Sequence, residues 1–192
     1  MNKSRLEAFS DGVLAIIITI MVLELKRPHD ISWEAIRQLI PVLISYVLSF
    51  IIVGVYWGNH HHLLHTVKYV TSGIIWANLH LLFWLSLIPF ATAWMGESSF
   101  DGPHVAVYGG LQCLCGIAYY ILLRLIAKNN PDNDSVTEAL RKQSGKGMFS
   151  VVIYILSIII AFFQPLVAAG FIALVPVIWF VPDRNIEKAL RE

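Results

Sequence analysis

Long apolar stretches alternate with short polar segments along the whole chain. A bilayer core of about 30 Å is crossed by roughly 20 helical residues. The pattern therefore predicts an all-α, polytopic membrane protein, with residues 1–192 forming one transmembrane domain. The six predicted spans are about 8–25, 39–56, 74–94, 105–127, 148–163 and 166–181.

The last two predicted spans are short, and only Gln164 and Pro165 separate them. They could instead form one kinked helix, which would leave five crossings. The basic residues decide between the two topologies, because cytoplasmic segments carry an excess of Lys and Arg. With six spans, 11 of the 14 basic residues lie on one side of the membrane. Five spans would move the basic C-terminal segment to the other side, so six spans with both termini in the cytoplasm are predicted.

Local signals refine the ends of these helices. Ser32 has the character of an N-cap, so the second helix is expected to begin before the membrane. Asp134 and Ser135 are expected to cap a short cytoplasmic helix that ends at Leu140. Three prolines lie within spans and are expected to mark kinks: Pro41, Pro89 and Pro176.

Composition agrees with the membrane assignment. The chain is 57% hydrophobic and 14% charged, with a mean hydropathy of +0.66. Soluble domains are about 45–50% apolar and about 25% charged, so a soluble enzyme is excluded. The net charge of +1 gives no indication of a nucleic-acid partner. Cys113 and Cys115 point about 200° apart on a helix, which excludes a bridge between them and leaves them as small packing residues.

The first span begins with polar residues and continues as nearly pure hydrocarbon. At 100° per residue, Ile16, Thr19, Ile20 and Leu23 lie at about 0°, −60°, +40° and −20° and form one stripe. Asp11 lies about 140° from Ile16. Because carboxylates avoid lipid, Asp11 is expected to face the subunit's own bundle. A stripe of this kind is most often simply core or lipid contact.

The segment "RLEAFSD" resembles the Arg-x-x-x-Phe-Ser-Asp signature of the transmembrane-protein-175 family of potassium channels, through Arg5, Phe9, Ser10 and Asp11. Members of this family are lysosomal in animals and have shorter bacterial relatives. The resemblance implies a homotetramer in a bacterial-type plasma membrane, with the first helix of each subunit lining a central pore. It also implies that the four signature residues orient that helix by packing and hydrogen bonding. No enzymatic activity and no cofactor are expected, and potassium is the expected permeant ion.

The resembled family places its hydrophobic constriction at positions that match Ile16, Ile20 and Leu23. Four copies of Ile16 are expected to form the narrowest ring, which would gate by dewetting. An ion passing this ring sheds part of its hydration shell, and potassium does so at lower cost than sodium, so a modest preference is expected. Thr19 either offers oxygen atoms to the ion or bonds back to the carbonyl four residues earlier, and the sequence leaves both open.

A histidine-rich segment, "YWGNHHHLLHTVKY", ends the second span. His61 and His65 have the i, i+4 spacing of metal ligands, so a metal- or haem-binding oxidoreductase is a rival interpretation. In the resembled family, however, Trp and His of the second helix bond the first-helix signature. That analogy favours Trp57, Asn59 and either His61 or His62 as partners of the signature residues.

A secondary transporter with a site inside each subunit is the second rival. Such transporters show paired broken helices in inverted repeats, and no internal repeat is visible here. Asn78 and His80 are polar residues within the third span. Both are expected to form hydrogen bonds to other helices.

Overall fold

The chain is a bundle of helices, and no strand occurs in the described residues. The computed structural model describes residues 2–26, 32–129 and 134–180, with the backbone alone from 134 to 139. Seven helical segments occupy these ranges: α1 (Lys3–Leu23), α2 (Trp33–His65), α3 (Ser72–Ser86), α4 (Ile88–Glu97), α5 (Gly102–Lys128), α6 (Asp134–Ala161) and α7 (Pro165–Phe180).

α3 and α4 form one interrupted rod, which reduces the seven segments to six. The interruption falls at Leu87, two residues before Pro89. Proline has no N–H to donate, and its ring clashes with the carbonyl four residues earlier. The kink expected at Pro89 therefore appears. Pro41 and Pro176, in contrast, lie inside helices that continue without a break.

The last two helices form an antiparallel hairpin. α6 ends at Ala161, and α7 begins at Pro165. Near the turn, the Ser157 hydroxyl donates to the Ala168 carbonyl at 3.0 Å. Farther away, the Trp179 indole N–H donates to the Ser150 hydroxyl at 2.8 Å. The two pairs run in opposite directions along the chain, so the arrangement with six elements holds and a single kinked helix does not.

Two helices are longer than the apolar patterns that predicted them. The Ser32 hydroxyl caps α2 by accepting from the Ala35 N–H at 3.2 Å, as expected. α2 then runs for 33 residues, about 50 Å at 1.5 Å per residue. α6 runs unbroken from Asp134 to Ala161, so the prediction of a separate short helix ending at Leu140 was wrong. Hydrophobicity predicts only the part of a helix that lies in lipid, because the backbone hydrogen bonds of a helix can continue beyond its apolar stretch.

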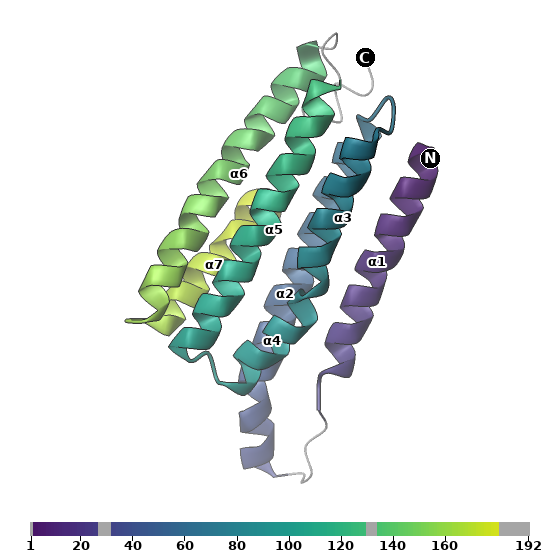
Figure 1. Ribbon diagram of the computed structural model, residues 1–192. Helices are drawn as coiled ribbons and strands as arrows, with labels where there is room; N and C mark the ends of the chain where they lie inside the picture. The colour runs from purple at the N-terminus through teal and green to yellow at the C-terminus, as the bar shows by residue number, and fades with distance from the viewer. Residues whose placement is uncertain (1, 27–31, 130–133, 181–192) are drawn as a thin grey trace.

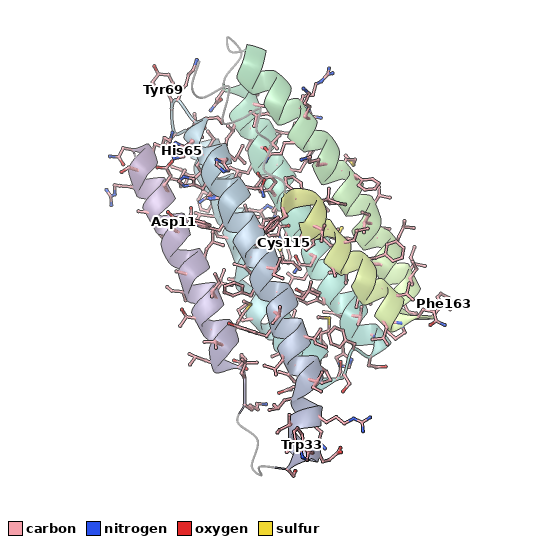
Figure 2. All side chains as sticks on the ribbon, turned by 180° about the vertical axis from the view of Figure 1, so that it is seen from behind. Asp11, Trp33, His65, Tyr69, Cys115 and Phe163 are labelled. Carbon is pink, nitrogen blue, oxygen red and sulfur yellow. The ribbon has the colours of Figure 1, made fainter. Side chains whose placement is uncertain are left out.

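Five of the rods in the described chain are long and apolar enough to cross a membrane. α7 has 16 residues, about 24 Å. Figure 1 shows α1 along one edge of the bundle, α5 near the middle and α6 at the opposite edge. α1 contacts α2, α3 and α4. The start of α1 and the α2–α3 connection share one end of the bundle, and Trp33 lies at the other end (Figure 2).

Candidate functional site

α1 has a buried face and an exposed face. The buried face carries residues at three- and four-residue intervals: Leu6, Ser10, Leu14, Ile17 and Met21. This spacing places them on one side of a helix. They pack into the bundle, so the rotation of α1 about its axis is set by this face.

The opposite face of α1 is apolar and uncovered. Ile16 is 59% exposed and Leu23 is 75% exposed, and Ile20 lies between them at 41%. Within the described residues of one chain, nothing covers this stripe. We call Ile16, Thr19, Ile20 and Leu23 the α1 stripe. It points away from the buried polar contacts of the helix.

The hydroxyl of Thr19 belongs to the α1 stripe but is engaged locally. It donates to the Ala15 carbonyl at 2.8 Å. Of the two roles that the sequence left open, this is the bond to the preceding turn. The Thr19 side chain lies on the exposed face.

A chain of buried hydrogen bonds ties α1 to α3 and α2. The Asn78 amide donates to the Ser10 hydroxyl at 2.9 Å, and that hydroxyl donates to the Leu6 carbonyl at 2.8 Å. The Asn78 side-chain oxygen lies 2.7 Å from Nε2 of His60. Because that oxygen can only accept, His60 carries its hydrogen on Nε2. All three side chains are buried.

This network resists rotation of α1. A buried polar group without a partner costs about 1–3 kcal/mol. Turning α1 so that Ser10 leaves Asn78 would break the middle of the chain and expose its remaining members to hydrocarbon. The network therefore fixes which face of α1 points outward, while Leu14 and Ile17 fill the space below it.

A second set of contacts connects the N-terminal turns of α1 to the C-terminal end of α2. The Trp57 indole N–H donates to the Asp11 carboxylate at 3.0 Å. His61 stacks on Trp57 at a ring distance of 6.1 Å and meets His65 edge-on at 4.5 Å. The Lys3 ammonium donates to the His65 carbonyl at 2.7 Å. A cation at the C-terminal end of a helix is favoured by the helix dipole.

Several of the predicted site residues have other surroundings. Arg5 and Phe9 lie on the exposed side of α1, so neither packs into the bundle of its own chain. The Asn59 amide donates to the Val55 carbonyl within α2. His62 meets His61 edge-on and lines a groove between α2 and α7.

The residues that bond Ser10 differ from those the sequence favoured. His60, not His61 or His62, closes the buried chain, and it does so through Asn78. Asn78 bonds across helices as expected. His80 does not, because its ring accepts from the Trp84 indole one turn along the same helix at 2.8 Å. In the part of the chain that the structure describes, no three His, Cys, Asp or Glu side chains converge as metal ligands would.

Comparison with known proteins places this arrangement in a family. Residues 5–89 match the family model described as the endosomal/lysosomal potassium channel TMEM175. The chain is 52% identical over the full length of both proteins to a potassium channel of Chryseobacterium sp. (strain P1-3). The chain belongs to the TMEM175 family. This is a family of channels and not of enzymes.

Other TMEM175 relatives match in part or in fold. The crystal structure of a lysosomal potassium-selective channel TMEM175 homolog from Chamaesiphon minutus superimposes with a TM-score of 0.83 at 25% identity. That match covers 94% of this chain and 97% of the other. The endosomal/lysosomal proton channel TMEM175 of Gallus gallus is 30% identical over 103 residues, which are 47% of this chain and 21% of the chicken protein.

Proposed function

We propose that this protein is a potassium-preferring cation channel in which four copies of α1 surround a central pore. Family membership and full-length similarity to a protein named as a potassium channel support the activity. The observation that carries the assignment of the pore is the exposed α1 stripe, which lies opposite the buried Ser10 face. One face of α1 is fixed by packing and hydrogen bonds, and the opposite face is apolar and exposed. Such a helix is suited to pack against α1 of the other subunits.

The pore would work through partial dehydration. Four copies of Ile16 form its narrowest ring, with Ile20 and Leu23 as further apolar layers. Such a ring offers no carbonyl or carboxylate ligands, so an ion crosses it by losing part of its water. Potassium holds its water less strongly than sodium and meets the lower barrier. A narrow apolar constriction also closes readily, because water in it has few hydrogen-bonding partners.

The buried network would keep that ring in register. If Asn78 and His60 hold Ser10, the rotation of α1 is the same in all four subunits and the Ile16 side chains meet at one depth. Trp57 and Asp11 add a second attachment near the end of the pore. Ser10 and Asp11 would therefore act at a distance of one to two helical turns from the constriction.

A flux measurement tests the activity. Purified protein in liposomes should dissipate a potassium gradient faster than a sodium gradient and should leave an N-methylglucamine gradient nearly intact. Protein-free liposomes and liposomes with heat-denatured protein are the controls. Equal rates for all three cations, or no flux above the controls, would contradict the proposal. Saturation of flux with a fixed turnover number would favour the transporter instead.

The basic end of the bundle is proposed to lie in the cytoplasm of a bacterial plasma membrane. Lys3, Lys68 and Lys128 lie at this end, and Arg37 lies near the other. Lys68 and Arg37 are both exposed, whereas the native Cys113 and Cys115 are buried. We expect an impermeant maleimide to label Arg37→Cys in intact cells and to label Lys68→Cys only after permeabilisation. The reverse pattern would invert the topology.

A further inference from the structure

An apolar groove runs along α2 beside α7. Its volume is about 320 Å³, and it is lined mainly by α2 side chains at four-residue intervals. Two of these positions are Gly54 and Gly58, where an added Cβ would meet nothing within 4 Å. Because glycine has no side chain, these two positions leave the groove open along the helix surface between Phe50 and His62. Figure 2 shows α2 in front, with α7 to one side of it.

A smaller pocket inside the bundle adjoins the groove. The pocket has a volume of about 40 Å³ and shares Val55, Asn59 and Trp179 with the groove. Most of the polar side chains that line the pocket have hydrogen-bond partners. The Tyr119 hydroxyl donates to the Asn59 carbonyl at 3.2 Å and accepts from Gln143 at 2.9 Å.

Two tyrosines of the pocket are left without partners. The hydroxyls of Tyr56 and Tyr154 make no hydrogen bond with any described residue, although Tyr154 is only 2% exposed. Both tyrosines line the pocket. Buried polar groups are normally hydrogen-bonded, so a ligand with an acceptor atom is expected beside these hydroxyls.

We propose that the groove and the pocket together bind one phospholipid per chain, from the leaflet at the His65 end of the bundle. One acyl chain lies along Gly54 toward Phe50, and the glycerol and headgroup end lies beside Gly58 and His62. An ester carbonyl of the glycerol backbone accepts a hydrogen bond from Tyr56 or Tyr154. The site is separate from the α1 stripe and does not depend on the proposed pore.

The groove extends from the membrane interface into one leaflet. From Phe50 to His62 the helix rises by 12 residues, about 18 Å. Half of a hydrocarbon core is about 15 Å. The apolar stretch of α2 ends near Tyr56, at the level where tyrosine and tryptophan side chains favour the membrane interface. The Tyr56 hydroxyl thus lies close to the depth of the lipid esters, with Gly54 beside the acyl chain and Gly58 on the headgroup side.

Charge at the same end favours an anionic headgroup. Lys146 immediately precedes Gly147, a residue of the pocket wall, and its carbonyl accepts from the Ser150 hydroxyl. The described residues that line the groove and the pocket include no Asp or Glu. A phosphate near this turn of α6 would meet a cation and no opposing carboxylate.

Native mass spectrometry of the purified full chain with dioleoylphosphatidylglycerol tests the site. We expect one lipid per chain to survive collisional activation that removes the others. Gly54→Leu and Gly58→Leu should abolish this retention by filling the groove. The Tyr56→Phe/Tyr154→Phe double variant, which adds no volume, should weaken retention by about five- to tenfold, as expected for a lost hydrogen bond.

Gly110→Leu is the matched control, because Gly110 is another open helical glycine and lines neither cavity. It should retain the lipid like the natural chain. Equal retention in the groove variants and the control would overturn the proposal. The proposal would also be overturned if Gly54→Leu dissociated the oligomer and left lipid retention unchanged. In that case a neighbouring copy of the chain, not a lipid, would fill the groove. Unchanged retention in the double Phe variant would contradict the proposed hydrogen bond from the tyrosines to a lipid ester.

Discussion

The Ile16→Asn channel is expected to conduct more current and to distinguish potassium from sodium less well than the natural channel. Asn offers an amide oxygen and N–H groups where the α1 stripe has only hydrocarbon, so a passing ion regains some of the interactions that it loses with water. If the barrier falls by about 1.4 kcal/mol, conductance rises about tenfold. Sodium gains more than potassium, because its dehydration costs more, and the permeability ratio moves toward one.

Single-channel recording in planar bilayers, with potassium on one side and sodium on the other, measures both quantities. Ile155→Asn is the control, because Ile155 is also an exposed isoleucine but lies on α6, at the far edge of the bundle from α1. It should leave conductance and reversal potential unchanged. If Ile16→Asn gives natural potassium and sodium currents, Ile16 is not the constriction and the pore lies elsewhere.

Asn78→Leu is expected to destabilise the protein and to suppress its current. The substitution removes the middle of the buried chain, leaving the His60 N–H without an acceptor and Ser10 without a donor. Hydrogen bonds between helices in membranes average about 0.6 kcal/mol, but an orphaned buried donor adds a cost of about 1–3 kcal/mol. A loss of about 2–4 kcal/mol is therefore expected, with greater rotational freedom of α1.

Thermal unfolding in detergent and potassium flux in liposomes measure the two effects. His80→Leu is the matched control, because His80 is exposed and bonds only within α3. It should change stability far less than Asn78→Leu. If both variants unfold at the same temperature as the natural protein, the Ser10–Asn78–His60 chain does not anchor α1. Normal flux in a destabilised Asn78→Leu variant would separate stability from the orientation of the pore helix.

Local patterns predicted what depends on neighbours along the chain. The apolar stretches located the helices, and Ser32 and Pro89 marked a cap and a kink. Periodicity predicted a stripe on α1, and Ile16, Ile20 and Leu23 are indeed on the uncovered side. These features follow from the 3.6-residue repeat and from backbone chemistry, so they need no knowledge of the fold.

The buried polar partners could not be predicted in the same way. Ser49, Thr92 and Tyr108 come from three helices and form a buried cluster, with the Ser49 and Tyr108 oxygens 2.6 Å apart and those of Ser49 and Thr92 2.7 Å apart. Nothing in the separate spans points to this meeting. A hydroxyl in a span signals a hydrogen bond, but the identity of its partner depends on how the helices are rotated and offset.

The histidine segment shows the division most clearly. Through its resemblance to the TMEM175 family, the sequence predicted that polar and aromatic groups at the end of α2 contact the start of α1, which agrees with the tendency of groups that avoid lipid to face protein. Only the tertiary structure decided that His60 reaches Ser10 through Asn78, while His61 stacks on Trp57. Successive helical residues point about 100° apart. A difference of one residue therefore moves a histidine to another face, and the packing of α1, α2 and α3 selects which one is buried.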